Sequence, residues 1–464
     1  MEKTHAIKNL TALELQAEIA QFTQRVSKLF HEQRTNQLAR ETGFVERESK
    51  LTGHLFLTVF TFGMSLYGTP SLNELIGLLN VVAPELEISR QGFHERLNEE
   101  AVVFFEKMLA KSVALELPQR LSKEIEALNA HFVRILIFDS TSFQLPAELA
   151  SYFRGSGGGA SEAAVKILFG YDFKAGELFY HVTDGTTHDQ LTDSGFLQKI
   201  KAGDLEISDL GFFNITTFAQ LQTRGAFYLS RLRSDVKVYQ RVEGKLVEFD
   251  LATFAQNLLG EHAELDVYLQ NKDTMLQTRL VVMRVPEHVK AERLRKRNEQ
   301  NRKKGHTTKQ RVQILMGFNL YITNVPATIL AVEQVRALYG IRWQIELVFK
   351  NWKSNFKLAK VTGKKPERIK CILYAKLLLI MITTKVCLVA RNYAWLNAHR
   401  EVSMFQATKH LKIVALLWLI AIVLQPANGA QILGNAITFM TKRCLKGASK
   451  KRAYPLVLLE ALGA

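Results

Sequence analysis

Residues 133–138 form a short apolar run, Val-Arg-Ile-Leu-Ile-Phe, which is followed directly by Asp139. Apolar runs of this length that end at a polar residue are typical of a buried β-strand. The other strands expected in this part of the chain are 164–173, 177–184, 205–208 and 226–233. Helices are expected between them, over 187–201 and 214–222. Three strands that we expect to be antiparallel, followed by crossover units, predict an α/β fold.

The segments around this predicted sheet have different residue patterns. Residues 234–330 are rich in strand signals, at 236–241, 246–250, 265–269, 276–285 and 312–325. The two ends of the chain are instead dominated by helical spacing of apolar residues. The sequence therefore predicts five parts: a helical N-terminal domain (1–125), the first part of a core (126–233), an inserted β-rich domain (234–330), a core helix (331–365) and a helical C-terminal domain (366–464).

Two helix starts in the N-terminal part suggest a helix-turn-helix. Ser71 lies three residues before Glu74, which is the spacing of a capping box, and a second start follows at Ser89. The second helix would carry polar side chains suited to reading DNA, namely Arg90, Gln91, His94 and Arg96. An ordinary pair of packed helices fits the same pattern, so both interpretations stay open at this point.

The charge balance indicates a polyanionic partner. The chain has 61 Lys and Arg against 44 Asp and Glu, a formal net charge of +17. Nucleic acid is the leading candidate, although charge can also serve solubility alone. The three cysteines lack metal-ligand spacing and no apolar leader follows Met1, so we expect a cytoplasmic protein. Two apolar segments, 377–384 and 413–424, fall short of the roughly 20 residues of a membrane span, which favours buried helices.

Two further stretches invite a phosphate-binding interpretation. Residues 290–311 carry ten cations and two glutamates, a net charge of +8. We interpret this stretch as a loop that contacts phosphate, with a solvated, mobile loop as the alternative. The glycine-rich segment 155–159 lacks the Gly-Lys-Ser/Thr ending of a phosphate loop, so we expect a flexible connection there.

The stretch from Tyr339 to Lys353 carries most of the chemical signal. On a single α-helix, at about 100° per residue, Tyr339, Arg342, Glu346 and Lys353 share an arc of about 60°. An adjacent apolar stripe of Ile341, Ile345, Val348, Phe349 and Trp352 would pack on a sheet. A surface i,i+4 ion pair is the plain alternative, but Arg before Glu is its less favourable orientation. A carboxylate flanked by cations suits a divalent metal beside phosphates.

Asp139 and Asp209 both follow predicted buried strands, so they can join Glu346 at one place. Cleaving a phosphodiester requires an activated nucleophile and a stabilised leaving oxygen, and two Mg²⁺ ions achieve both. Mg²⁺ prefers hard oxygen ligands, and three carboxylates on a rigid frame can hold it. These residues predict a metal-dependent phosphodiester site in which water or a DNA 3′-hydroxyl attacks.

On these residues the chain resembles a bacterial insertion-sequence transposase of the Asp-Asp-Glu type. It is similar to the family founded on insertion sequence four, whose mark is Tyr-x2-Arg-x3-Glu-x6-Lys, matched by Tyr339, Arg342, Glu346 and Lys353. Asp139 in Phe-Asp-Ser-Thr and Asp209 in Asp-Leu-Gly-Phe-Phe resemble the two aspartates of that family. Arg231 and the segments around Gly317-Phe318 and Thr323-Asn324 also fit, and the resemblance covers about residues 130–365.

The resemblance implies a ribonuclease-H-like catalytic core with an inserted β-rich domain and helical flanks. It implies cut-and-paste transposition, in which a homodimer binds the inverted-repeat ends of an element, cleaves them with two Mg²⁺ ions (or Mn²⁺) and joins the 3′-hydroxyls to target DNA. Asp139, Asp209 and Glu346 would bind the metal, and Tyr339, Arg342, Lys353 and Arg231 would contact DNA. A cytoplasmic, nucleoid-associated location without a membrane follows.

Some roles stay open at the level of sequence. Relatives can form a hairpin intermediate and hold a flipped base on an aromatic of the inserted domain, for which Tyr239, Tyr268 and Phe249 are the candidates here. The cluster of Asp184, His188 and Asp189 suits turns and caps better than metal binding. Two alternatives remain beside an active transposase: a DNA-binding protein without catalysis, and a membrane-associated protein built on the apolar C-terminal helices.

Overall fold

The computed structural model describes residues 11–47, 49–127, 129–156, 161–189, 195–361, 363–447 and 455–463. Helices occupy the N-terminal part of the described chain, as predicted for residues 1–125. They are α1 (Ala12–Leu29), α2 (Glu32–Glu41), α3 (Gly53–Tyr67), α4 (Leu72–Val82), α5 (Arg90–Glu95), α6 (Glu99–Val113) and α7 (Gln119–Ala127).

Both predicted helix starts of the N-terminal part are confirmed. At α4, the Ser71 hydroxyl accepts the Glu74 N–H at 3.2 Å, and the Glu74 carboxylate accepts the Ser71 N–H at 2.7 Å. At α5, Ser89 caps by accepting the N–H of Gly92 at 3.0 Å. Each bond satisfies a backbone donor that the first helical turn leaves without a partner.

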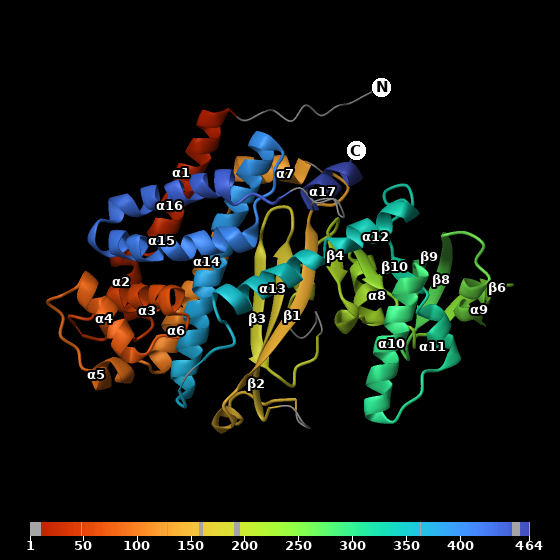
Figure 1. The fold of residues 1–464 in the computed structure, drawn as a ribbon, viewed down its shortest axis with the longest axis horizontal. Helices are drawn as coiled ribbons and strands as arrows, with labels where there is room; N and C mark the ends of the chain where they lie inside the picture. The colour runs from red at the N-terminus through yellow and green to blue at the C-terminus, as the bar shows by residue number, and fades with distance from the viewer. Residues whose placement is uncertain are drawn as a thin grey trace.

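Ten described strands form a single continuous sheet (Figure 1). They are β1 (Ile135–Leu145), β2 (Ala163–Asp172), β3 (Leu178–Asp184), β4 (Leu205–Ser208), β5 (Phe227–Arg231), β6 (Val238–Val242), β7 (Lys245–Phe249), β8 (His262–Gln270), β9 (Met275–Arg284) and β10 (Phe318–Thr323). The order is β3-β2-β1-β4-β5-β10-β9-β8-β6-β7. The first three are antiparallel, and β4 and β5 run parallel to β1, as the sequence predicted.

The segment 234–330 is not purely strand. It also contains helices α9 (Leu251–Gln256), α10 (Glu287–Lys304) and α11 (Gln310–Leu315). The strand predicted over 312–325 is therefore wrong at its start, and only β10 is strand there. The loop predicted over 290–311 is also wrong, because α10 and α11 occupy most of it. The strands of this segment extend the core sheet, and the division into five domains stays a prediction.

Two other expectations need correction. Asp139 does not follow its strand, because β1 continues to Leu145, beyond the apolar run. The helix predicted over 187–201 is reduced, among its described residues, to the short 3-10 helix η2 (Leu197–Lys199); residues 190–194 lie outside the described chain. The helix predicted over 214–222 is confirmed as α8 (Ile215–Thr223), with Asn214 as its cap.

The two faces of the sheet are covered by different helices. Residues 135 and 137 of β1 join a core with the helical part of the protein, whereas residues 136 and 138 face a second core with α8 and α9. The first face carries α12 (Val332–Gly340) and α13 (Trp343–Asn355), with Phe169 of β2 packed against Trp352 at 4.7 Å between ring centroids. Figure 1 shows α13 crossing in front of the strands on this face.

The C-terminal helices are α14 (Pro366–Ala398), α15 (Met404–Leu424), α16 (Pro426–Arg443) and α17 (Pro455–Gly463). The two apolar segments belong to helices longer than the sequence indicated: α14 and α15 are long and apolar enough to cross a membrane by length and composition. The most apolar window of α14 is 94% buried inside the protein, against 44% for α15. The prediction of a buried helix therefore holds for α14, whereas α15 exposes Ile413 and Leu417.

Helix α14 connects the N-terminal and C-terminal helices with each other. It packs against α3, α6, α7, α15 and α16. Its buried Lys385 donates a hydrogen bond to the carbonyl of Val113 at 2.6 Å and another to that of Leu115, at the end of α6. Carbonyls at a helix end lack partners within the helix, so the ammonium satisfies both while it fixes α14 to α6.

Candidate active site

Asp139 and Asp209 lie side by side because their strands are parallel and in register. Phe138 of β1 is paired with Ser208 of β4, and the next residue along each chain segment is an aspartate, Asp139 in β1 and Asp209 after β4. Ile137 and Ile207 contribute to the core beneath α13, and side chains alternate faces along a strand. Asp139 and Asp209 therefore both point to the face that carries α13.

Asp139 is a carboxylate in an unfavourable environment for its charge. Only 16% of its side chain is exposed. Burial raises its pKa to about 6, and the negative charges of Asp209 and Glu346 act in the same direction. The Ser140 N–H, which donates to Oδ1 at 2.8 Å, and the Arg342 guanidinium oppose the shift. The strand register places Asp209 beside Asp139, and the Arg342 guanidinium connects Asp139 to Glu346.

Asp209 is held by the turn that it starts. It is the N-cap of the 3-10 helix η3 (Leu210–Phe212), and its Oδ1 accepts the N–H of Gly211 at 2.8 Å. A Cβ atom at Gly211 would lie 3.0 Å from that same oxygen and 3.1 Å from Oδ2 of Asp189. Asp189 in turn forms an ion pair with Lys166 at 2.8 Å. This close approach explains why a glycine suits position 211.

Glu346 lies on α13, and Arg342 connects it to Asp139. The guanidinium Nη1 of Arg342 lies 3.6 Å from Oδ2 of Asp139, and Nη2 donates to Oε1 of Glu346. The i,i+4 ion pair of Arg342 and Glu346 is thus present, in its less favourable orientation. Arg342 is a cation placed between two acids that would otherwise repel each other.

The single helix predicted over 339–353 is wrong in one respect. Helix α12 ends at Gly340 and α13 begins at Trp343, with tighter backbone bonds such as Gln344 N–H to the Ile341 carbonyl at 2.9 Å between them. Tyr339 is therefore on the preceding helix. It still belongs to the site, because its ring centroid lies 5.8 Å from the Arg342 guanidinium and 5.2 Å from the Tyr321 ring.

The residues at the exposed side of α13 are open to a large ligand. Lys353, two turns after Glu346, is exposed, and the described residues include no ion pair for it. Trp343 begins the helix with 46% of its side chain exposed, three residues before Glu346. Sequence periodicity could not single out Trp343, because an aromatic at a helix start is usually part of a core. Its exposure beside the acids makes it available for contact with a base.

The acids fit a hard divalent cation by their chemistry. Three carboxylates supply the oxygen ligands that Mg²⁺ prefers. Within the described ranges, however, no group of three acid or His and Cys side chains is close enough to form a metal cluster. Arg342 occupies the space between Asp139 and Glu346 with its own positive charge. The carboxylates can hold a metal only after this guanidinium moves or shares the site.

Other sequence candidates lie elsewhere. Tyr268 is on β8, five strands from β1, which at about 4.8 Å per strand is roughly 24 Å across the sheet. Tyr239 is its partner on β6, and Phe249 packs against Phe254 at 5.4 Å. Asp184 accepts the N–H and hydroxyl of Thr186, which confirms its turn role. The structure thus places Asp139 beside Asp209 and connects Asp139 to Glu346 through Arg342, but it does not bring these aromatics to the same place.

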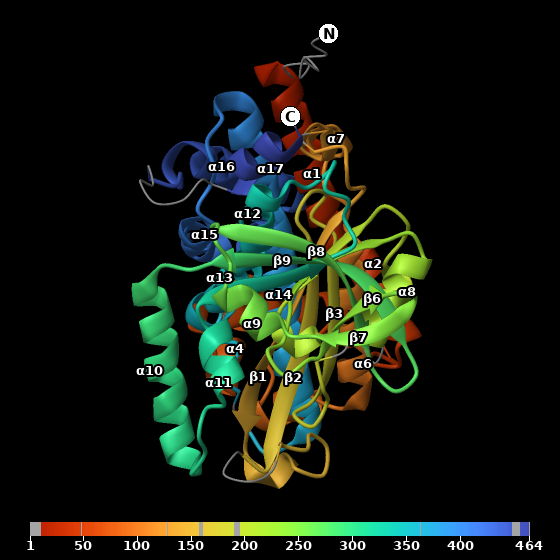
Figure 2. The same ribbon diagram turned by 90° about the vertical axis from the view of Figure 1, so that its right-hand side faces the viewer.

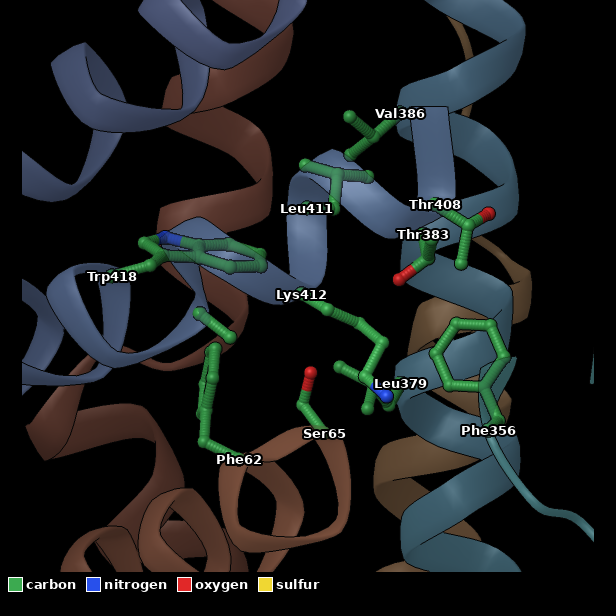
Figure 3. A pocket seen from close by; sticks show the side chains of 11 residues that line it. Phe62, Ser65, Phe356, Leu379, Thr383, Val386, Thr408, Leu411, Lys412 and Trp418 are labelled. Atoms are coloured by element: carbon green, nitrogen blue, oxygen red, sulfur yellow. The ribbon is translucent and has the colours of Figure 1, made fainter. Parts of the chain in front are cut away.

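The cavities among the helices are not where the acids lie. The one in Figure 3 is lined by residues such as Phe62, Lys412 and Trp418, and its volume of about 10 Å³ is close to that of a single water site. A larger one of about 250 Å³ lies between α13 and α14 and is mostly apolar. The three acids are half-buried and line none of these cavities.

Comparison with known proteins gives a consistent result. Residues 131–382 match the family described as the transposase DDE domain. The chain is 31% identical over 410 residues to the transposase for insertion sequence element IS231B of Bacillus thuringiensis subsp. berliner, covering 85% of each chain. It is 28% identical over 396 residues to the transposase for insertion sequence element IS1151 of Clostridium perfringens, covering 81% of this chain and 82% of that one.

A solved structure also aligns over most of the chain. It is the cryo-EM structure of a piggyBac transposase synaptic complex with hairpin DNA, and the alignment covers 97% of this chain and 87% of that one. The TM-score is 0.40 at 11% sequence identity. This likeness is too small to carry an argument about the fold or the site.

Proposed function

Because the chain belongs to the bacterial insertion-sequence transposases with a DDE domain, we propose that it catalyses cut-and-paste transposition of its element. It would bind the terminal inverted repeats, hydrolyse the phosphodiester at each end and join the 3′-hydroxyls to target DNA by transesterification. The observation that carries this proposal is the row of Asp139 and Asp209 on adjacent parallel strands beneath Glu346.

Asp139, Asp209 and Glu346 are the residues that would hold the metal. Two Mg²⁺ ions, with Mn²⁺ as a substitute, would activate the attacking oxygen and stabilise the leaving oxygen. In the absence of metal, Arg342 balances the charge of Asp139 and Glu346. Tyr339 shields the other side of that guanidinium, since its ring faces it at 5.8 Å.

The cations around the acids would bind DNA phosphates. Lys353 is exposed along the same helix as Glu346, and Arg231 lies on β5 next to β4. Arg342 can move from its carboxylate partners to a phosphate oxygen once a metal neutralises them, because guanidinium binds either group bidentately. Each of these contacts positions the backbone of the DNA and reads no base.

The first five strands support a ribonuclease-H-like core. Three antiparallel strands followed by two parallel ones, in the order β3-β2-β1-β4-β5, place both aspartates on inner strands of this five-stranded part. The remaining strands, β6–β10, belong to the proposed insertion and its return to the core. We infer that the helical segments before and after this core position the DNA.

The N-terminal helices would bind the repeat. Around α5, cations gather beside the start of α14: the pKa of His94 is lowered by partial burial and by the charges of Arg368, Lys365 and Arg90. Such a group of cations is unfavourable alone and becomes favourable beside phosphate. This supports the helix-turn-helix interpretation of α4 and α5. The enzyme would act as a homodimer that pairs two ends, in the cytoplasm at the nucleoid.

The first test is cleavage of a labelled duplex that carries the terminal repeat, with Mg²⁺, Mn²⁺ or EDTA. Asp139→Asn, Asp209→Asn and Glu346→Gln should each abolish metal-dependent nicking at the repeat boundary and leave binding within a few-fold. Asp235→Asn is the control, because Asp235 is exposed and already paired with Arg233 at 2.6 Å. Near-normal cleavage by a triad variant would remove that residue from the site.

A DNA-binding protein without catalysis is the second candidate function. It is favoured only by the arrangement of Arg342, which closes the space between two acids in the described structure. Specific binding of the repeat without a cut, under every metal tried, would support it. The presence of all three acids and of both flanking cations favours the active enzyme.

A further inference from the structure

Three arginines act through their charge on one buried tyrosine, on the face of the sheet that carries the acids. Tyr321 of β10 is 4% exposed, and burial raises its pKa. The charges that oppose this shift are those of Arg231 on β5, Arg336 on α12 and Arg293 on α10. We call Arg231, Arg293 and Arg336 the arginine cluster.

The backbone places this cluster in line with the acids. Arg231 is paired with Tyr321, and continuation of the register of β4 and β5 sets Arg231 beside Asp209. Asp139, Asp209, Arg231 and Tyr321 therefore form one row across four neighbouring strands. At about 4.8 Å per strand, Arg231 is about 10 Å from Asp139 across the sheet.

The cluster has no anion of its own. Among the residues that the structure describes, none of the three arginines forms an ion pair. The Nε atom of Arg231 is buried without a hydrogen-bond partner. Burial and the charges of Arg231 and Arg336 lower the pKa of Arg293. Like charges gathered without a counter-ion cost free energy, which an anionic ligand would recover.

The Arg293 guanidinium is held by hydrogen bonds, whereas the Arg336 side chain is exposed to solvent. Arg293 donates to the carbonyl of Phe318 at 3.0 Å, to that of Met316 at 3.2 Å and to Oδ1 of Asn319 at 2.6 Å. These bonds fix the guanidinium at the start of β10. Arg336 is exposed on α12, and its side chain has no hydrogen bond within the described part of the chain. A hydrogen-bonded and an exposed cation thus act on the same tyrosine.

Helix α10 extends the positive surface away from the cluster. It is strongly polar on all sides, and Figure 2 shows it standing at the edge of the molecule, outside the sheet. Its acids are already paired within the helix, with Lys296 to Glu292 at 2.6 Å as the shortest pair. Cations such as Arg297 and Arg302 then remain for a partner. A helix without an apolar face gains little from packing on protein, and it suits contact with a charged backbone.

We propose that the arginine cluster binds a backbone phosphate of the element DNA, close to but distinct from the phosphate at the acids. The spacing of about 10 Å places this contact within about three nucleotides of the scissile bond. The cluster would thereby fix the strand on both sides of Tyr339, whose ring lies between Tyr321 and Arg342. This inference rests on the proposed function, because it requires that the acids act on DNA.

The test is binding of the full chain to a terminal-repeat duplex at several salt concentrations without divalent metal. Arg336→Gln should weaken binding roughly threefold to tenfold and reduce the slope of log affinity against log salt by about 0.9, the value for one lost phosphate contact. Arg233→Gln is the matched control: it makes the same change two residues from Arg231, but Arg233 is already neutralised by Asp235 at 2.6 Å. It should leave the slope unchanged.

A second measurement locates the phosphate. Neutral methylphosphonates are placed one at a time within four nucleotides of the cleavage position. The wild-type protein should lose affinity at one or two of them, and Arg336→Gln should no longer respond there. Arg231→Lys, which keeps the charge but loses the planar guanidinium, should give an intermediate loss. The wild-type protein could bind and cut its repeat while Arg336→Gln keeps both the salt slope and the methylphosphonate response. This result would overturn the phosphate contact of the arginine cluster and leave the proposed function standing. Failure of the wild-type protein to bind the repeat at all would overturn the proposed function as well.

Discussion

Asp139→Asn should stabilise the metal-free protein while it abolishes cleavage. The carboxylate is 16% exposed and lies beside Asp209 and Glu346, so the folded protein favours its protonated form. Asparagine keeps the shape of the side chain and an oxygen that can accept the Ser140 N–H, but it carries no charge. The main effect of the substitution on stability is therefore the loss of the unfavourable ionisation.

The magnitude follows from the pKa in the folded and unfolded states. Burial and the neighbouring acids raise the Asp139 pKa from 3.8 to about 6. Because the raised value belongs to the folded state, the wild-type protein loses stability as the pH rises from 3.8 to 6, and the loss is complete above 6. Linkage then gives Asp139→Asn an advantage of about 1.5 kcal/mol at pH 5 and about 3 kcal/mol at pH 8. Both free-energy differences are upper values, because solvent at the partly exposed carboxylate screens its charge.

The assay is thermal or denaturant unfolding in EDTA, followed by tryptophan fluorescence, at pH 5 and pH 8. Trp352 reports on this part of the protein because it packs on the same face of the sheet. At an unfolding entropy of about 2.1 cal/mol/K per residue, a chain of 464 residues converts an advantage of about 2–3 kcal/mol into a midpoint raised by about 2–3 °C at pH 8, and by less at pH 5. Asp235→Asn should show no such gain, because Arg233 lowers the pKa of Asp235. A stabilisation that is absent or does not grow with pH would refute the reasoning.

Three further results are expected. Arg134→Met should destabilise the protein by about 3–5 kcal/mol in denaturant titrations, since it leaves the fully buried Asp204 carboxylate without its partner at 2.6 Å. Gly170→Ala should cost about 1–3 kcal/mol in the same assay, because its Cβ would lie 2.4 Å from the ring of Phe138, and a cost below the error of the titration would count against that packing. Lys353→Ala should lower the salt slope of repeat binding by about 1, and an unchanged slope would place this exposed side chain away from phosphate.

The sequence predicted the local structure correctly where a short residue pattern had a direct physical cause, such as a helix cap or a buried strand. Ser71 with Glu74 predicted a cap that the structure contains, and the apolar run before Asp139 predicted the central strand. The approach of Asp139 to Asp209 could be expected because each comes directly after a short apolar run, and these two runs pair as parallel strands. These are short-range patterns, and they determine the local backbone without help from distant residues.

The errors arose where distant contacts decide the structure. Val312–Leu315 has a β-branched start, but packing of α11 beside α9 makes it helix. The helix break before Trp343 leaves no mark in the periodicity, since Arg342 and Ile341 suit a helix as well as a turn. The cluster of Arg231, Arg293 and Arg336 comes from three segments far apart in the chain, so spacing in the sequence could not reveal it.

The position of α14 has a consequence for how the protein is made. Helices α3 and α6, with the stacked rings of Phe56 and Phe60, rest on a helix that ends at Ala398. At about 5–20 residues per second, a ribosome needs about 15–60 s to progress from the end of α6 to the end of α14. During that time the aromatic side chains of the first helices have no complete cover. A nascent chain is therefore exposed to chaperones and proteases until most of it has been translated, and a truncated product lacking α14 should aggregate or be degraded rather than persist as a separate DNA-binding fragment.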